Sequence, residues 1–119
     1  MAINNKLKNY LEERMRFIKE NKRVRIKQFY TGAVVYKITN INNDKVYIGA
    51  CDDFYKRSRE HIMSLFNNYH FKKEIQDDFN NGDNFKIEII LKIINNEIKQ
   101  KKFLEDYYID YYSQIKEVY

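Results

Sequence analysis

The sequence predicts an α+β domain, a small three-stranded antiparallel sheet flanked by helices, with an extra basic helix at the N-terminus. Apolar residues alternate with polar ones over residues 34–50 and 85–93, as in strands that bury one face. Apolar residues recur at helical spacing over residues 54–69, 71–79 and 97–112. A chain of 119 residues, 44% of them hydrophobic, is long enough for one domain with a modest core.

Two strands of the predicted sheet form a hairpin. Residues 34–39 and 46–50 alternate apolar and polar side chains, and the polar residues 40–44 between them supply the turn. Each strand carries one tyrosine, Tyr36 in the first and Tyr47 in the second. The register of the strands, which the sequence leaves open, decides whether the two phenols share a face. Because tyrosine favours half-buried strands, a pair among 11 tyrosines is also what ordinary packing would give.

The helix over residues 54–69 carries two further candidate residues. Asp52 or Asp53 is suited to cap its N-terminus, and Arg57 and His61 lie one turn apart, on or beside its apolar stripe. Guanidinium groups suit phosphate oxygens and histidine titrates near neutral pH, so this pair could clamp a phosphate and help to move a proton. The alternative is that Arg57 extends to solvent while His61 packs, which is common for helix neighbours at this spacing.

The last third of the chain predicts a short helix that ends near Gly82, a strand over residues 85–94 and a helix over residues 97–112. Glu105 shares one side of that helix with Tyr108, although helix glutamates are mostly exposed. The expected apolar surface of this helix consists of Phe103, Leu104, Tyr107, Tyr108 and Tyr111.

The net charge of +5 is unevenly distributed along the chain. Residues 1–29 hold nine Lys or Arg and three Glu, so the rest of the chain is nearly neutral. This segment predicts a helix with an apolar stripe, followed by a basic run whose cations are candidate DNA-phosphate contacts. An equally reasonable reading is a helix packed on the core with a solvated charged face. The stripe is Ile3, Leu7, Leu11, Met15 and Ile18, and the candidate DNA-binding residues are Lys22, Arg23, Arg25 and Lys27.

Cysteine content and hydropathy limit the cellular setting. The single Cys51 excludes an intramolecular disulfide and a cysteine-cluster zinc site, which favours a reducing intracellular compartment. No apolar run approaches the length of a membrane span, and the first residues are polar and amphipathic. We therefore expect a cytoplasmic protein with no membrane partner.

The ordered series of motifs resembles the GIY-YIG nuclease family, particularly the free-standing and intron-encoded endonucleases of phages. Val34-Val35-Tyr36 corresponds to the first family motif and Tyr47-Ile48-Gly49 is an intact second motif. Arg57 and His61 match the arginine and histidine of the family. The resemblance covers residues 32–119 and is more specific than any one motif.

The resemblance also implies a set of roles. Tyr36 would act as general base and Arg57 would stabilise the phosphate, with Tyr47 and His61 in the hydrogen-bond network of Tyr36. Glu105 would bind a divalent cation, Mg²⁺ or Mn²⁺. The expected catalytic set is therefore Tyr36, Tyr47, Arg57, His61 and Glu105, with His70 as a possible additional member.

These roles describe a metal-dependent DNA endonuclease. We expect a monomer in solution, which can act on DNA as a monomer or as a dimer. Residues 32–119 would form the nuclease domain and residues 1–31 a basic helical extension.

The chain departs from the family pattern at three positions. Val34 stands where the family usually has glycine, Ser58 stands where an aromatic residue often follows the arginine, and no asparagine follows Tyr119. Two alternatives to an active nuclease therefore remain: an inactive DNA-binding module of the same fold, and an interaction domain that associates through its tyrosine-rich final helix.

Overall fold

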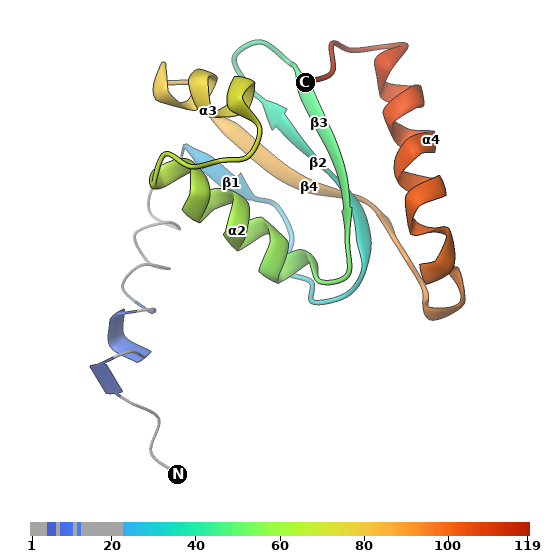
Figure 1. Cartoon of the computed structure of the whole chain (residues 1–119), viewed down its shortest axis with the longest axis horizontal. Helices are drawn as coiled ribbons and strands as arrows, with labels where there is room; N and C mark the ends of the chain where they lie inside the picture. The colour runs from blue at the N-terminus through green and yellow to red at the C-terminus, as the bar shows by residue number, and fades with distance from the viewer. Residues whose placement is uncertain (1–4, 7, 11, 13–22) are drawn as a thin grey trace.

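The computed structural model of the chain describes residues 5, 6, 8–10, 12 and 23–119 (Figure 1). Those before residue 13 are helical, whereas the predicted N-terminal apolar stripe and Lys22 lie outside the described residues. The elements in order are β1 (Val24–Ile26), β2 (Val34–Asn40), β3 (Val46–Cys51), α2 (Phe54–Phe66), α3 (Lys73–Asn80), β4 (Phe85–Lys92), the 3₁₀ helix η1 (Asn95–Gln100) and α4 (Lys101–Ser113). The predicted α+β class is confirmed.

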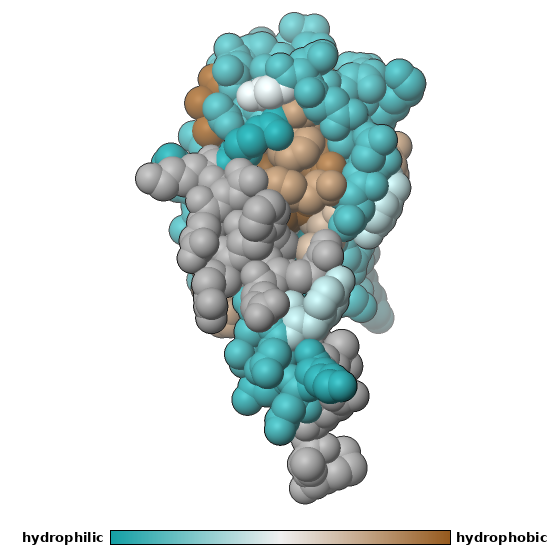
Figure 2. All heavy atoms as spheres, turned by 90° about the vertical axis from the view of Figure 1, so that its left-hand side faces the viewer, coloured by the Kyte–Doolittle hydropathy of each residue, from teal (hydrophilic) through white to brown (hydrophobic). Residues whose placement is uncertain are grey.

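The sheet, with strand order β1-β4-β2-β3, separates two layers of helices (Figure 1). Helices α2 and α3 cover one face and α4 covers the other, and each face buries its own apolar cluster. On the side of the molecule shown in Figure 2, hydrophilic residues surround a smaller apolar area. No helix in the described part of the chain is both long and apolar enough to cross a bilayer. The buried cores of the two clusters are Val24, Val34, Tyr36, Ile38, Cys51, Phe54, Ile62, Leu65, Ile75, Phe79, Phe85 and Ile87 under α2 and α3, and Ala33, Val35, Val46, Ile48 and Ile93 under α4.

The predicted hairpin is present, and its register shows that Tyr36 and Tyr47 share a face of the sheet. Strands β2 and β3 are antiparallel, with Tyr36 opposite Gly49 and Ile38 opposite Tyr47. Because side chains alternate between the faces of a strand, Tyr36 and Tyr47 both project toward α2, as diagonal neighbours. Their ring centroids lie 6.3 Å apart.

The sheet has four strands, so the predicted three-stranded sheet was one strand short. Val24–Ile26 form β1, which pairs in parallel with β4, and the expectation of a helix through residue 31 was wrong for this stretch. The amide of Lys27 donates to the Ile87 carbonyl at 3.0 Å and extends the pairing. Val24 and Ile26 alternate around Arg25 as strand residues do, but three residues within a basic run are too few to stand out as a period of two.

A β-bulge in β4 lies beside Tyr36. Val35 pairs with Leu91 and Tyr36 pairs with Ile89, so the ladder skips Ile90. The regular alternation expected over residues 85–94 therefore breaks, and both Ile90 and Leu91 pack in the cluster under α4. Bulges commonly change the direction of side chains near functional sites, and this one lies in the strand that pairs with β2 at Tyr36.

Helix α4 buries a different face from the one expected. Leu104, Tyr108 and Ile109 pack on the sheet, whereas Phe103 and Tyr107 are exposed. The predicted apolar surface mixed residues from both sides of the helix, because aromatic residues occur all around it. Glu105 lies one helical turn before Tyr108 and Ile109, so it belongs to the packed face itself, and its side chain is 22% exposed.

The C-terminal residues close the edge of the sheet next to β3. Val118 forms a parallel bridge with Val46, and the amide of Tyr119 donates to the Val46 carbonyl at 2.8 Å. The Tyr119 hydroxyl donates to Asp78 Oδ2 at 2.5 Å and accepts from Asn40 Nδ2 at 2.9 Å. The Tyr119 side chain thus links the end of β2 to α3.

Replacing Tyr119 by phenylalanine is expected to destabilise the fold by about 1–3 kcal/mol, because the fully buried Asn40 amide loses a partner and Asp78 loses a donor. Urea denaturation followed by circular dichroism measures the change. Tyr111→Phe, at an exposed position on α4, is the matched control and should change stability by less than about 0.5 kcal/mol. Equal stability of the two variants would show that the Tyr119 hydroxyl contributes nothing.

Candidate active site

Three aromatic rings from three different elements meet on the α2 side of the sheet. Tyr36 comes from β2, Tyr47 from β3 and His61 from α2, and the His61 ring lies 5.5 Å from Tyr36 and 5.9 Å from Tyr47 between ring centroids. Tyr36 is only 1% exposed, so its hydroxyl meets other groups inside the protein. The structure thus brings together three of the residues that the sequence selected as candidates.

Gly49 makes room for the Tyr36 ring. A Cβ atom at Gly49 would lie 2.5 Å from the Tyr36 hydroxyl oxygen and 2.6 Å from Cζ, closer than real Cβ atoms approach other groups. The ring of Tyr36 therefore lies across the glycine directly opposite it in the hairpin. This contact gives a physical reason for glycine at the end of the motif Tyr47-Ile48-Gly49.

The Tyr36 hydroxyl begins a chain of hydrogen bonds that reaches two histidines. The Tyr36 oxygen lies 2.6 Å from His61 Nε2, and His61 Nδ1 lies 2.8 Å from His70 Nε2. The backbone N–H of Lys72 donates to His70 Nδ1 at 3.0 Å. His61 is 2% exposed and His70 is 7% exposed. The sequence did not decide whether His70 belongs to the site or lies on the surface. In the structure His70 is buried and stacks on His61.

Burial keeps both histidines neutral. Desolvation, with smaller effects of His70 and Arg57, lowers the pKa of His61 to about 3. Desolvation also lowers the pKa of His70, opposed by the hydrogen bond from the Lys72 backbone. The low dielectric of the interior disfavours the charged form of each imidazole.

Lowering the pH is expected to destabilise the fold through His61. Its pKa of about 3 in the folded protein lies below the ordinary value of 6.5, so between these values the unfolded chain binds a proton that the folded chain does not. The corresponding stability is fully present above pH 6.5 and is lost as the pH falls toward 3. Urea denaturation across this range should show a steeper fall for the wild type than for His61→Phe. Equal slopes in the two proteins would contradict a neutral His61.

The phenols of Tyr36 and Tyr47 are both hard to ionise in the free protein. Burial raises the pKa of Tyr36 and the nearby Tyr47 raises it further, while the adjacent Arg57 guanidinium acts in the opposite direction. Burial, followed by the negative charge of Glu105, raises the pKa of Tyr47. A Tyr36 phenolate therefore requires additional positive charge or hydrogen-bond donors at the site.

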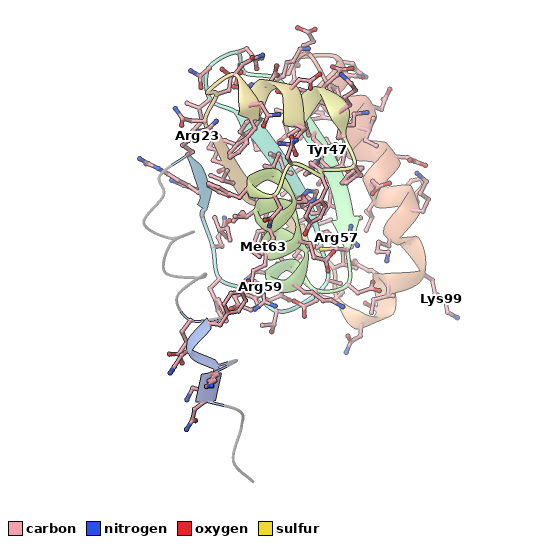
Figure 3. All side chains as sticks on the ribbon, turned by 60° about the vertical axis from the view of Figure 1, so that its left-hand side comes forward. Arg23, Tyr47, Arg57, Arg59, Met63 and Lys99 are labelled. Atoms are coloured by element: carbon pink, nitrogen blue, oxygen red, sulfur yellow. The ribbon has the colours of Figure 1, made fainter. Side chains whose placement is uncertain are left out.

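Arg57 lies one helical turn before His61, where it adjoins the Tyr36 hydroxyl and remains partly open to solvent. Asp53 caps the helix by accepting a hydrogen bond from the Lys56 amide, which settles the choice between two candidate caps. The Arg57 side chain is 42% exposed, and its Nε lies 3.6 Å from Glu60. Figure 3 shows Tyr47 and Arg57 on the side of α2 that adjoins β3.

Glu105 reaches this region from the other layer of the protein. Helix α4 packs on the opposite face of the sheet, but β3 is an edge strand, and the Glu105 charge acts on Tyr47. Its side chain is 22% exposed and pairs with Lys102 at 3.2 Å. No group of three or more Asp, Glu, His or Cys residues in the described part of the chain could hold a metal ion, so this carboxylate is not part of a ready-made metal cage.

Gln76, which was not among the residues selected from the sequence, positions His70. The Gln76 side chain accepts a hydrogen bond from the His70 amide at 3.0 Å and donates to the Leu65 carbonyl at 3.0 Å. It is 6% exposed, and it joins α3 to the end of α2. The signal that could have pointed to a buried Gln76 is its place in the helix between the apolar residues Ile75 and Phe79.

The candidate DNA-binding residues divide into two kinds. Arg23 lies with its guanidinium 3.8 Å from the Phe79 ring centroid, and donates to the Asp83 carbonyl at 2.9 Å and to the Phe79 carbonyl. Arg25 and Lys27 are exposed. Figure 3 places Arg23 beside β1, away from Arg57. The contacts of Arg23 therefore support the fold, and Arg25 and Lys27 are the exposed cations in the part of this run that the structure describes.

Two of the departures from the family pattern are accommodated in the core. Val34 is fully buried and pairs with Cys51 in the hairpin. Ser58 is 1% exposed, and its hydroxyl donates to the Phe54 carbonyl at 2.7 Å. Neither residue adds a polar group without a partner beside Tyr36.

Comparison with known proteins agrees with this architecture. A family model, the GIY-YIG catalytic domain, matches residues 32–117. The chain is 37% identical over 60 residues to Intron-associated endonuclease 1 of Enterobacteria phage T4, over 50% of this chain and 24% of that protein. The solved catalytic domain of homing endonuclease I-TevI aligns with a TM-score of 0.60 at 30% identity, covering 66% of this chain and 86% of that one. A mutant form of the same domain aligns with a TM-score of 0.59 at 30% identity, covering 70% and 84%.

The fold and the residues gathered beside its edge strand define a nuclease catalytic domain. The chain belongs to the GIY-YIG family, which confirms the family predicted from the sequence motifs. The match covers 24% of the length of the phage T4 endonuclease.

Proposed function

We propose that this protein is a metal-dependent DNA endonuclease that hydrolyses phosphodiester bonds at the Tyr36 cluster. The observation that carries the proposal is the buried Tyr36 hydroxyl, held 2.6 Å from His61 and adjoining the Arg57 guanidinium. Such an arrangement joins a proton acceptor to a phosphate-binding cation. The homing endonuclease and intron-associated endonuclease to which the chain is similar support DNA as the substrate.

Glu105 fits a divalent cation that is shared with the substrate. Its side chain is partly exposed, its negative charge raises the pKa of Tyr47, and its present partner is the exposed ammonium of Lys102. Carboxylate oxygens suit Mg²⁺ and Mn²⁺, and Mg²⁺ is often held by one carboxylate, phosphate oxygens and water. When bound there, the ion would supply positive charge that stabilises the leaving oxygen.

Tyr36 would orient the attacking water and accept its proton as general base. The pKa of its phenol is raised in the free protein, chiefly by burial, so the phenolate needs the positive charge that arrives with substrate and metal. Arg57 already opposes the effect of burial, and His61 lies within hydrogen-bond distance of the phenol oxygen. Tyr47 would complete this network.

Arg57 would neutralise charge that builds on the phosphate as the water attacks. Its planar guanidinium offers several donors, and its partial exposure leaves it accessible to a DNA strand. Exposed Arg25 and Lys27 would add contacts with the phosphate backbone at a distance from the reaction. One such site cuts one strand, so cleavage of both strands requires two molecules on the DNA or two successive nicks by a monomer.

Nicking of supercoiled plasmid at low salt tests the proposal. The wild type is expected to nick with Mg²⁺ or Mn²⁺ and to leave the plasmid intact in EDTA. An intact plasmid in every lane, together with a retained shift of DNA in a gel, would instead assign an inactive DNA-binding module. Loss of both cleavage and DNA binding would leave the self-association alternative, which size-exclusion chromatography tests.

A further inference from the structure

The hydrogen bonds that end at Tyr36 have only one internally consistent direction. The backbone N–H of Lys72 can only donate, so His70 Nδ1 must accept and carries no proton. Neutral His70 then has its proton on Nε2, which faces His61 Nδ1 at 2.8 Å. His61 Nδ1 must accept in turn, which puts the proton of neutral His61 on Nε2, facing the Tyr36 oxygen at 2.6 Å.

The neutral state of both rings, on which this assignment depends, follows from their surroundings. His61 is 2% exposed and His70 is 7% exposed. The charged groups nearest to them include the Arg57 guanidinium, whose positive charge opposes protonation of His61. The opposite direction would give His70 a proton on Nδ1, facing the Lys72 N–H, so two buried donors would point at each other.

We propose that His70 is a positioning residue that fixes the tautomer of His61, so that His61 always presents an N–H to the Tyr36 oxygen. The tautomer of His61 follows from the hydrogen bonds between neutral rings, and only its consequence for DNA cleavage rests on the proposed function. His61 in this tautomer cannot accept the Tyr36 proton. It instead donates a hydrogen bond that stabilises the Tyr36 phenolate once the proton has left.

The surroundings of His70 hold its ring in the orientation that this role requires. Gln76 Oε1 accepts a hydrogen bond from the backbone N–H of His70 at 3.0 Å. The Gln76 amide group is itself fixed, because its Nε2 donates to Asn80 Oδ1 at 2.9 Å. The His70 ring stacks on Phe71 with 4.7 Å between centroids. The bond from the Lys72 amide closes a turn of only two residues, so local backbone geometry sets the first link of the chain.

The Tyr36 proton has a different route out of the site. The Tyr36 and Tyr47 hydroxyls are close enough to interact, and Tyr47 is only partly buried. With His61 acting as donor, the Tyr36 O–H is free to donate toward Tyr47. Without His70, His61 could carry its proton on Nδ1 and accept from Tyr36, which would stabilise the neutral phenol and raise the pKa of the general base.

Long-range proton–nitrogen correlation NMR on the free protein near neutral pH tests the tautomer without DNA or metal. We expect His61 as the Nε2–H tautomer in the wild type and a shift toward Nδ1–H in His70→Phe, which keeps a ring but has no nitrogen. Tyr69→Phe, an exposed neighbour in the same loop, should behave as the wild type. A wild-type His61 protonated on Nδ1 would overturn the proposal, even if His70→Phe failed to fold.

The pH profile of single-turnover plasmid nicking supplies a second readout. In His70→Phe the rise of the rate with pH is expected to move to higher pH, because the phenolate of Tyr36 has lost its donor. A rate reduced equally at every pH would indicate a merely structural role and would contradict the proposal. Absence of cleavage by the wild type would refute the nuclease function and leave the tautomer result intact.

Discussion

Replacement of Glu105 by glutamine is expected to lower the rate of plasmid nicking at least about 100-fold, because a metal ion at a phosphoryl centre contributes several kcal/mol and each 1.4 kcal/mol is tenfold in rate. Glutamine keeps the shape of the side chain and loses the negative charge that would hold the cation. Single-turnover nicking with saturating Mg²⁺ measures the effect. Since Glu105 is partly exposed and its ion pair with Lys102 is a surface pair, the melting temperature should hardly change.

Asp106→Asn is the matched control for this experiment. Asp106 is the next residue on α4 and pairs with the same lysine, Lys102, at 2.9 Å, but it is more exposed than Glu105. Its replacement removes an equal charge from the same helix and should leave nicking within about twofold of the wild type, as expected for a surface charge outside the site. Equal activity of the two variants would rule out Glu105 as the metal ligand.

Tyr36→Phe is expected to lower the nicking rate by about 10²–10⁴, the usual contribution of a positioned general base. The same change removes the partner of His61 Nε2 inside the protein, so it should also cost about 1–3 kcal/mol of stability. The assay must therefore run well below the melting temperature of the variant. DNA binding in a gel shift should be unaffected, because the substitution removes no positive charge and the proposed phosphate contacts come from Arg57, Arg25 and Lys27.

Tyr107→Phe serves as the control, since it removes a hydroxyl from the exposed side of α4. A Tyr36→Phe protein that is folded and nicks at the wild-type rate would exclude Tyr36 as the base. Tyr36 would also be excluded as the base if the nicking rate of Tyr36→Phe fell only in proportion to the fraction of the variant that is unfolded.

The residue pattern predicted the hairpin and the helix after it because both depend on local sequence. Alternation over two strands, polar turn residues and a capping aspartate are short-range signals, and Tyr36, Tyr47, Arg57 and His61 lie on these elements. Their order along the chain also led to the correct family. Whether the two phenols shared a face depended on strand register, and only the structure resolved it.

Other features depend on contacts between distant parts of the chain, which a residue pattern does not contain. Strand β1 is stabilised by pairing with β4, about 60 residues later, and the bulge at Ile90 exists only relative to β2. The link from Gln76 to His70 likewise requires α3 to pack beside the end of α2. Helix α4 was predicted as a helix, but its many aromatic residues concealed which face is buried.

Strand β1 and the bridge between Val118 and Val46 determine where this domain must begin and end when it is used in a fusion protein. The region that the family model matches, residues 32–117, omits both β1 and the bond from Tyr119 to Val46. A fragment cut at those limits would leave β4 as an exposed edge strand, which can pair with another molecule. It would also lack the hydrogen bond from Tyr119 to Val46 beside β3. The unit that can be moved into a fusion protein is thus longer at both ends than residues 32–117, and it includes Arg23 and Tyr119.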